Sequence, residues 1–357
     1  MGANFCNFGG EGIIMRKDVL EEIDMLEKFD NMTTWTEFEE ILTAAVAAGY
    51  PGLINADAEG TVISPGPYIA GSDKLEEAYW VDVAGDGNGQ IYIDQADGKV
   101  KCYYMNEDYK NNLIRIGDWY TKGLVYKDAS TAEEYADQQI KNGVGTAMVK
   151  TLEYGWAGSL PAACGCEMAV KFTGAMNLLG TGAFTKFGWA VPVTAQEPEA
   201  AVKFINLLYS ENDIHTTLCW GQEGIDWEKA EDGTAQFVGG AESAEYHMND
   251  FLYGDIMTMI PWTGSDPNIR EEQKKMNEEV EPSKYIGFSV DNTAVASQVT
   301  ACQNVSNEYK PMLSSGVYGA DTEAKYQEYI AALEGAGIND IIAEYQRQLD
   351  EWLASQN

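Results

Sequence analysis

The sequence predicts an α/β fold, and residues 187–211 give the clearest reason for it. A short apolar run at 189–193 is typical of a buried strand, and it turns directly into a helix. Thr194 and Glu197 have capping-box spacing, and Pro198 stands where the first helical turn tolerates a missing N–H. One helical face then carries Ala201, Phe204, Ile205 and Leu208. A strand that turns sharply into an amphipathic helix is a unit of an α/β domain.

Two earlier stretches add to this pattern. Residues 12–22 pass from a short strand into the start of a helix. Thr34 and Glu37 again have capping-box spacing, and a helix follows them until the Gly-Tyr-Pro-Gly run at 49–52. Its apolar positions share one face, which predicts a buried stripe made of Trp35, Phe38, Ile41, Leu42, Ala45 and Val46.

The other periodic segments predict a meander, two helices and a hairpin. Residues 80–104 alternate as three short strands, and Asp232-Gly233 marks the turn of a hairpin. Residues 106–124 predict a helix that ends at Gly123, with Tyr109, Leu113, Ile116 and Tyr120 facing inward. The C-terminal helix has a single apolar face, formed by Ile338, Ile341, Ile342, Tyr345, Leu349, Trp352 and Leu353.

Length and charge limit the classes of function. A chain of 357 residues is long enough for two domains, each with its own core. Its 57 acidic and 23 basic residues give a net charge of −34, which excludes a general affinity for nucleic acid phosphates or anionic membrane surfaces. So much acid indicates either a well-solvated surface or a protein exposed outside the cell. No apolar run approaches the ~20 residues of a membrane span, and the N-terminus has neither a signal-peptide pattern nor a lipidation site at Cys6.

No metal or cofactor site is expected. The six cysteines are scattered, and Cys164-Gly-Cys166 has no second pair to complete a zinc site, so free and mostly buried thiols are predicted. The two histidines, His215 and His247, are expected at the surface or at a helix end. The turn at 86–89 resembles a calcium loop, but two carboxylate ligands are missing, so a hairpin turn is the better interpretation.

No catalytic residues stand out either. With 57 carboxylates, any pair could be proposed as the acid and nucleophile of a glycosidase, so such a pair has little meaning. The sequence contains no nucleophile elbow, dinucleotide fingerprint, P-loop or zinc-protease motif. We therefore do not expect an enzyme.

Four stretches resemble the family-1 extracellular solute-binding proteins that feed ABC importers. They are the Thr-Trp-Thr-Glu-Phe helix at 34–38, the Gly-Thr-Ala-Met strand with aromatic residues beyond it at 145–156, the strand and helix at 187–211, and the C-terminal region from 283. The last stretch is the most specific, with Ile-Gly-Phe-Ser-Val-Asp at 286–291 and a long helix from Gly337. It is similar to a Gram-positive lipoprotein branch, the LipO-like or aldouronate-transport-like proteins.

The resemblance implies a two-lobed, periplasmic-binding-protein-like fold of type II, with a cleft between the lobes. It also implies that the first part of lobe one is missing from these residues. The lobes would be divided so that residues 1–15 end lobe one and form the first hinge, 16–170 form lobe two, 171–240 form the remainder of lobe one, and 241–357 return to lobe two and end in helices.

The implied function is capture of a carbohydrate, expected to be an oligosaccharide, by closure of the lobes. The protein would be a monomer, anchored outside the cell as a lipoprotein in its full-length form, and would pass its ligand to permease subunits of an ABC transporter. The alternatives are a secreted carbohydrate-active enzyme or a lectin-like surface module. A third is a remnant without its first lobe that serves as a scaffold.

A sugar site needs aromatic planes and hydrogen-bonding side chains. Of nine tryptophans, Trp35, Trp119 and Trp352 lie in amphipathic helices and are expected in the core. Trp227 lies at the start of the predicted hairpin, and this position favours neither the core nor a binding site. Five others lie at strand ends or in Gly- and Pro-containing loops, where exposed platforms can be built: Trp80, Trp156, Trp189, Trp220 and Trp262.

The resemblance favours Trp156, with Tyr154 beside it, because the family places an aromatic residue past this strand. Burial in the lobe-one sheet is the competing interpretation for Trp189. Three polar residues could bind sugar hydroxyls or could simply be solvated loop residues: Glu153, Gln222 and Asp266.

Overall fold

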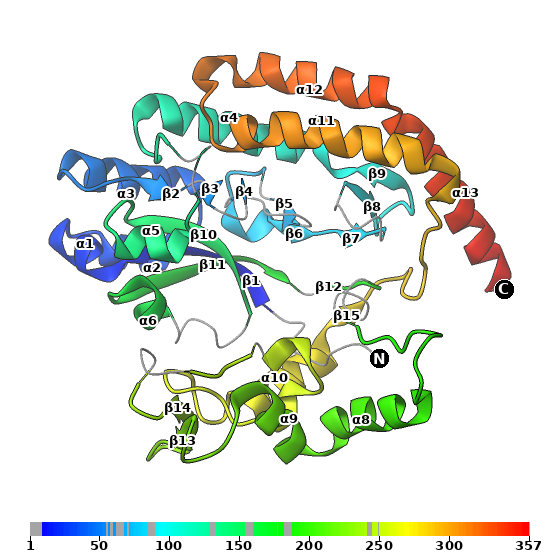
Figure 1. The fold of residues 1–357 in the computed structure, drawn as a ribbon. Coiled ribbons are helices and arrows are strands. Elements are labelled where there is room, and N and C mark those ends of the chain that lie inside the picture. The colour runs from blue at the N-terminus through cyan, green and yellow to red at the C-terminus, as the bar shows by residue number, and fades with distance from the viewer. Residues whose placement is uncertain are drawn as a thin grey trace. The chain divides into compact units, whose positions relative to one another are not determined.

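The computed structural model describes residues 9–54, 56–57, 60–61, 68–69, 71–84, 90–128, 131, 133–153, 160–176, 178–181, 188–240, 245–248 and 250–356 (Figure 1). Its contacts divide the chain into two compact units. Unit 1 comprises residues 1–8, 153–159 and 182–281, and unit 2 comprises residues 9–152, 160–181 and 282–357. Within the described residues, no helix is both long and apolar enough to cross a membrane.

A four-stranded sheet forms the centre of unit 2. Its strands are β1 (Gly9–Arg16), β2 (Leu53–Ile54), β10 (Ala147–Glu153) and β11 (Met168–Met176), in the order β11-β1-β10-β2. β1 pairs antiparallel with β11, and β10 pairs parallel with β2. The strand predicted near residue 12 is confirmed, and its apolar run is fully buried at Ile13, Ile14 and Met15. Such a run is typical of a strand covered on both faces.

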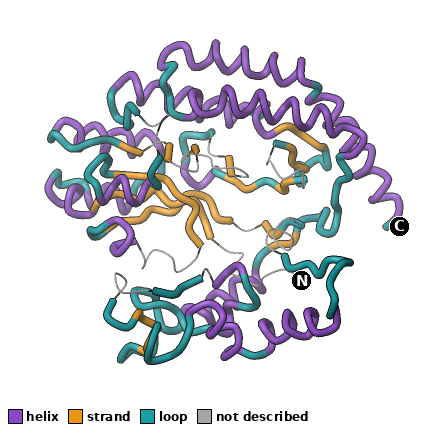
Figure 2. Tube along the Cα trace, viewed as in Figure 1, coloured by secondary structure: helices purple, strands orange, loops and turns teal. Residues whose placement is uncertain are grey.

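Short helices surround this sheet, as the left side of Figures 1 and 2 shows. They are α1 (Lys17–Glu22), α2 (Leu26–Asn31), α3 (Trp35–Ala47), α5 (Ala136–Lys141) and α6 (Leu160–Cys164). The predicted capping box of α3 is present: the Glu37 N–H donates to Thr34 Oγ1 at 3.1 Å, and the Thr34 N–H donates to Glu37 Oε2 at 3.0 Å. The predicted stripe of α3 is buried apart from Val46, which is half-buried.

The second core of unit 2 lies between the predicted meander and four long helices. The meander consists of β7 (Asp82–Val83), β8 (Ile91–Ile93) and β9 (Val100–Cys102), and both of its pairings are antiparallel. The helices are α4 (Glu107–Lys122), α11 (Ala296–Ser314), α12 (Thr322–Ala336) and α13 (Ile338–Ser355). Their shared core is rich in buried tyrosines, which are Tyr103, Tyr104, Tyr109, Tyr326, Tyr329 and Tyr345.

Both predicted long helices are present, and most but not all of their predicted inner residues are buried; Tyr120 of α4 is only half-buried. α4 ends at Gly123, whose positive φ of 73° favours glycine at this position. On α13, Ile338, Ile341, Tyr345 and Leu349 are buried and Trp352 is partly buried, whereas Leu353 is exposed. The short remaining strands and turns are β3 (Ala56–Asp57), β4 (Gly60–Thr61), β5 (Tyr68–Ile69), β6 (Tyr79–Trp80), β12 (Leu178–Leu179), β15 (Glu281–Pro282) and the 3-10 turns Leu75–Glu77, Tyr103–Met105, Asp250–Leu252, Ile256–Thr258, Thr293–Val295 and Gly319–Asp321.

Unit 1 is smaller and combines helices with long irregular segments. It contains α8 (Pro198–Ser210), α9 (Asn212–Trp220), α10 (Ile269–Glu279) and the predicted hairpin of β13 (Trp227–Lys229) and β14 (Ala235–Phe237). Its described core is small, and is formed by Cys219, Trp220, Trp227, Ala235 and Met259.

Two expectations for the stretch 187–211 are wrong. Residues 189–193 form no strand in the described structure, and Val193 at their end is fully exposed. The helix does begin at Pro198, but its N-cap residue is Glu197 and no side chain caps it. Thr194 lies too far before the first turn to act as the N-cap, so the expected capping box does not form.

The expected position of His215 at the surface is also wrong. Its side chain is fully buried, because α9 packs against the segment that contains Asp250. Its Nε2 lies 3.3 Å from the backbone oxygen of Asp250, and burial lowers the pKa of the imidazole.

The compact units do not follow the expected lobe boundaries. Residues 241–281 belong to unit 1, because Met259 and Trp262 pack against Trp220 and Trp227. Residues 9–15 and 171–181 belong to unit 2, because β1 and β11 are strands of its sheet. Which unit corresponds to which lobe stays a prediction.

The capping box of α3 gives the first testable prediction. Thr34→Ala removes the acceptor of the Glu37 N–H and should lower the free energy of unfolding by about 1 kcal/mol. Thr43→Ala is the matched control, because Thr43 is exposed and its hydroxyl bonds only to the Glu39 carbonyl one turn earlier. Urea denaturation of both variants measures the difference, and an equal effect of the two substitutions would contradict a role for the cap.

Candidate functional site

The structure brings two of the predicted tryptophans together in unit 1. The ring centroids of Trp220 and Trp262 are 4.7 Å apart, and Trp262 also lies 4.5 Å from Phe237 and 5.3 Å from His247. Trp227 completes this group, which we call the aromatic cluster, at 5.4 Å from Trp220. The cluster was not expected as a whole, because its members are far apart in the sequence.

The inner rings of the aromatic cluster are core residues. Trp220 is 1% exposed, and its indole N–H donates to Asp250 Oδ2 at 3.3 Å. Trp227 is also buried. Trp220 therefore offers no exposed plane to a ligand in this structure, contrary to its expected role as a platform.

The outer rings of the aromatic cluster are Phe237, His247 and Trp262. Phe237 and Trp262 are half-buried, whereas His247 is exposed, as the sequence predicts. The loop that carries Trp262 is fixed to β14, because the Ala235 N–H donates to Pro261 O at 2.8 Å and the Thr263 N–H donates to Ala235 O at 2.7 Å. A rigid, half-exposed indole can stack on the apolar face of a sugar ring. Burial lowers the pKa of His247, which favours its neutral form.

The other predicted residues of unit 1 are dispersed. Trp189 is half-buried and lies 5.3 Å from the ring of Tyr253. Asp266 is exposed, and its Oδ1 accepts the Asn268 N–H at 2.8 Å in the turn before α10. Gln222 is exposed, and its backbone N–H donates to Asp226 Oδ2 at 2.7 Å. Asp266 and Gln222 thus lie in solvated turns, which is the alternative to a role in binding sugar hydroxyls.

Of the ligand contacts predicted near residue 153, Tyr154 and Trp156 lie outside the described residues. The backbone places Glu153 as the last residue of β10 and Trp80 as the last residue of β6.

A buried polar group that the sequence pattern did not predict lies in unit 2, on β1. Glu11 of β1 is fully buried, and its Oε2 accepts the Thr151 hydroxyl at 3.0 Å. The Thr173 hydroxyl donates to the Glu11 backbone oxygen at 3.1 Å. The register of β1 against β11 shifts between Gly10 and Gly12, opposite this residue, and such bulges are frequent beside functional sites.

The chemistry of Glu11 differs from that of the other carboxylates. Burial raises the pKa of its side chain to about 8, although the hydrogen bond from Thr151 opposes the shift. Its Oε1 is buried and has no hydrogen-bond partner among the described residues. A neutral carboxyl can donate and accept hydrogen bonds, which matches the needs of a hydroxyl-rich ligand. The sequence does contain a signal for this buried carboxyl group: Glu11 lies between two glycines, directly before the apolar run at 13–15.

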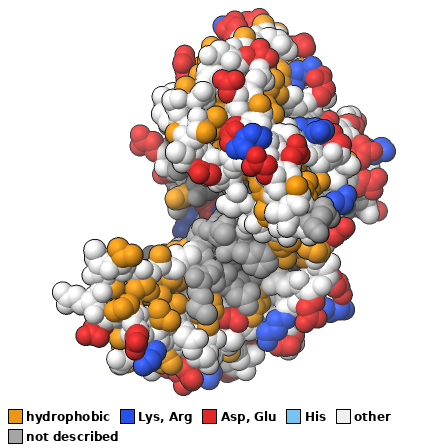
Figure 3. All heavy atoms as spheres, turned by 90° about the vertical axis from the view of Figure 1, so that its right-hand side faces the viewer, with side chains coloured by type: hydrophobic (Ala, Val, Ile, Leu, Met, Phe, Trp, Pro, Cys, Tyr) orange, Lys and Arg blue, Asp and Glu red, His pale blue; other side chains and the backbone are white. Residues whose placement is uncertain are grey.

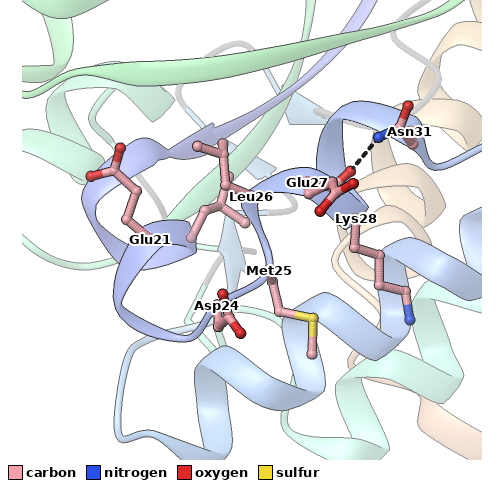
Figure 4. Close-up of a pocket in the computed structure, with 8 residues that line it drawn as sticks. Glu21, Asp24, Met25, Leu26, Glu27, Lys28 and Asn31 are labelled. Carbon is pink, nitrogen blue, oxygen red and sulfur yellow. Dashed lines mark hydrogen bonds between the residues drawn. The ribbon is translucent and has the colours of Figure 1, made fainter.

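A hollow beside α1 and α2 is less suited to a sugar (Figure 4). It has a volume of about 660 Å³ and is lined by Leu20, Glu21, Asp24, Met25, Leu26, Glu27, Lys28 and Asn31. Its charged side chains are solvated, and no aromatic ring lines it. A smaller hollow of about 280 Å³ lies in unit 1 beside α9, where the edges of Trp220 and Trp227 meet Asn212, Thr216 and Lys229.

Nothing in the described residues holds a metal ion. No group of three or more His, Cys, Asp or Glu side chains has the required geometry there. Cys164, Cys219 and Cys302 are buried free thiols, and burial raises the pKa of the first two to about 12 and of the third to about 11. Cys166 is a half-buried free thiol, and Cys6 lies outside the described residues. The prediction of free, mostly buried thiols is confirmed for these four.

Glu11 gives the second testable prediction. Its pKa is raised on folding, so the neutral carboxyl contributes stability that is complete below the unfolded pKa of 4.5 and is lost as the pH rises through about 8. Glu11→Gln cannot ionise, so its melting temperature relative to the unmodified protein should increase steadily from pH 5 to pH 8. Each pH unit in that window corresponds to about 1.4 kcal/mol.

Glu167→Gln serves as the control, because Glu167 is exposed at the start of the segment that leads into β11. It measures the effect of exchanging a carboxyl group for an amide at an exposed position. A Glu11→Gln difference that is constant across the same range would show that Glu11 is ionised in the folded protein.

Comparison with known proteins links the chain to transport proteins. A family described as a domain of unknown function, DUF3502, matches residues 284–354. The chain is 23% identical over 278 residues to a carbohydrate ABC transporter substrate-binding protein of Streptococcus pneumoniae serotype 4. This match covers 75% of the chain and 55% of the relative, so the chain spans about half the length of that curated relative.

Solved structures share the fold over almost the whole chain. The N-glycan transport solute binding protein NgtS from Streptococcus pneumoniae has a TM-score of 0.77 at 17% identity, and the match covers 100% of this chain and 75% of that one. An HMO binding solute binding protein from Bifidobacterium longum infantis has a TM-score of 0.61 at 15% identity, with 98% and 76% covered. The chain is therefore similar in sequence to a carbohydrate ABC transporter substrate-binding protein, and it shares the two-lobed α/β fold of the solved solute-binding proteins.

Proposed function

We propose that the protein is the extracellular substrate-binding component of an ABC transporter, which captures an oligosaccharide and delivers it to a membrane permease. The observation that carries the proposal is the similarity to the carbohydrate ABC transporter substrate-binding protein over 75% of the chain. The shared fold with NgtS, whose crystals contain Man1GlcNAc or Man5GlcNAc, supports a carbohydrate as the ligand class. These relatives are named as binding proteins, so the proposal includes no catalysis.

The proposed mechanism is capture by closure. A ligand that contacts both lobes binds the closed state more tightly than the open state, and this difference in affinity shifts the population. Such a motion needs two bodies that each keep their own core. The separate cores of unit 2 and unit 1 meet this requirement, because each is formed by residues of its own unit.

The proposed ligand contacts combine aromatic planes with hydrogen-bonding groups. Trp156 and Tyr154 are the first candidates, followed by Trp262 with its half-exposed ring. Glu11 is fully buried, so it is not counted among the ligand contacts. The remaining candidates are Trp80, Trp189, Glu153, Gln222 and Asp266, whereas Trp220 supports the ring of Trp262 from within the core.

The proposal also covers location and partners. The full-length protein would act outside the cell as a membrane-anchored lipoprotein and would work as a monomer. Its partners would be the permease subunits of the transporter. The net charge of −34 supports an exposed, strongly solvated surface and disfavours binding to nucleic acid.

The test is thermal melting of the full-length natural protein with a panel of oligosaccharides. The panel contains N-glycan fragments, HMO, fructo-oligosaccharides and alginate oligosaccharides. One class of sugar should raise the melting temperature, with about 2.7 kcal/mol of stabilisation when the ligand concentration is a hundred times Kd. Chromatography should then recover that sugar without hydrolysis. Steady release of shorter sugars would identify an enzyme, and no shift with any sugar would remove carbohydrate as the ligand class.

Trp156 gives the third testable prediction. If its ring stacks on a sugar, Trp156→Ala should weaken binding about tenfold or more, which is ~1.4 kcal/mol, and should change the melting temperature little. Calorimetry with the oligosaccharide found above measures the affinity. Trp352→Ala is the control, because Trp352 packs on Phe288 at 5.8 Å and should cost stability but no affinity. Unchanged affinity with a large loss of stability for Trp156→Ala would assign this ring to the core.

A further inference from the structure

Two of the chain's connections to unit 1 begin and end at neighbouring places in unit 2. The chain leaves unit 2 after Thr181 and returns to it at Pro282. We call residues 178–181 the outgoing segment and residues 282–287 the returning segment. Both segments belong to unit 2, although they are far apart in the sequence.

Backbone hydrogen bonds join the outgoing segment to the returning segment. The Ser283 N–H donates to Leu179 O at 2.9 Å. Further along, the Gly287 N–H donates to Thr181 Oγ1 at 2.8 Å. The two segments therefore lie side by side within unit 2.

Asp82 of β7 holds both segments in place. The Ser283 hydroxyl donates to Asp82 Oδ2, and the side-chain amide of Gln95 donates to the same oxygen at 3.4 Å and to Ser283 Oγ at 3.1 Å. We call Asp82, Gln95 and Ser283 the Asp82 network. The outgoing segment packs on it through Gly180, where a Cβ would lie 2.4 Å from Asp82 Oδ1. A glycine is thus required for this close approach.

The Asp82 network is buried, unlike most charged side chains. Acidic side chains are spread over the surface in Figure 3, but Asp82 is 5% exposed and Ser283 is 3% exposed. Burial raises the pKa of Asp82, and the hydrogen bonds from Ser283 and Gln95 oppose this shift. A buried carboxyl group is costly unless its hydrogen-bond partners stay in place. The network is therefore favourable only while the returning segment remains against β7.

This arrangement bears on how the connections move. A hinge between two bodies consists of a few residues whose backbone angles change when the bodies move. Where two connections take part in one hinge, the motion depends on whether they are independent or fixed to each other. The Asp82 network and the backbone bonds fix the outgoing and returning segments to each other and to β7. Both connections therefore start from one common base.

We propose that Asp82 is a positioning residue that makes the two connections, after Thr181 and before Pro282, act as one joint. With the network intact, unit 1 turns about this joint instead of moving on two independent tethers. The inference rests on the proposed capture by closure, but it requires no particular ligand. Breaking the network should let the two units take a wider range of relative positions while each keeps its own core.

The first test is hydrogen exchange of the full-length natural protein. In Asp82→Ala, the Ser283 and Gly287 amides should exchange about tenfold faster, which corresponds to ~1.4 kcal/mol, because the base that holds their segment is lost. Asp82→Asn is the conservative variant. Its amide oxygen still accepts a hydrogen bond, so it should restore most of the protection. Unchanged exchange in Asp82→Ala would show that the segments are held without Asp82, and the proposal would be wrong.

The second test measures the joint itself by single-molecule energy transfer without ligand. Dyes are attached through p-acetylphenylalanine at Tyr135 of unit 2 and Ile225 of unit 1, which are 54% and 67% exposed. Asp82→Ala should broaden the distribution of dye-to-dye distances. Since no ligand is present, the result does not depend on whether the protein binds a carbohydrate.

A second variant keeps this test decisive if Asp82→Ala is too unstable to measure. Gly180→Ala pushes the outgoing segment away from Asp82 without removing a hydrogen-bonding group, and it should broaden the distribution as well. Gly335→Ala is the matched control, because Gly335 is exposed in α12 and a Cβ there meets nothing within 4 Å. Distributions as narrow in Asp82→Ala and Gly180→Ala as in the control would assign the network to the stability of unit 2 alone and overturn the proposal.

Discussion

The double pairing of β1 is the interaction on which unit 2 depends. The strand lies between β11 and β10, so its backbone is hydrogen-bonded on both sides and its apolar residues are buried on both faces. This position explains the glycine at residue 12, where a Cβ would lie 2.8 Å from Leu152 Cδ1. It also explains why Glu11 holds its proton. Burial disfavours the charged carboxylate, and the only group that opposes this shift of its pKa is the uncharged Thr151 hydroxyl.

The parts of the fold that follow from short-range signals were predictable. The capping box of Thr34 and Glu37, the glycine end of α4 and the apolar face of α13 each depend on residues within a few helical turns. The three-stranded meander follows from alternation and turn residues in one continuous segment. In these cases, tertiary structure reinforces what the local sequence already favours.

The predictions that were wrong depend on contacts between residues far apart in the sequence. Residues 189–193 have a strand composition, but a strand forms only where another strand pairs with it. His215 and Trp220 are buried through contacts with residues 30 to 42 positions further along the chain, such as Asp250 and Trp262, which periodicity does not reveal. The candidate site shows the same limit, because Glu11 meets Thr151 only after β1 and β10 pair. The resemblance to a family supplied the fold class where periodicity could not.

The order of strands in this sheet has a consequence for how the protein is made. β1 is synthesised first, yet its partners β10 and β11 follow only after residue 147, with Ile14 opposite Val170. Contacts of such sequence separation are slow to form, because a long loop must close before any pairing stabilises it. During translation, the run Ile-Ile-Met therefore remains without its native neighbours while more than a third of the chain is added. A chaperone that holds this nascent segment would protect it from pairing with the wrong strand.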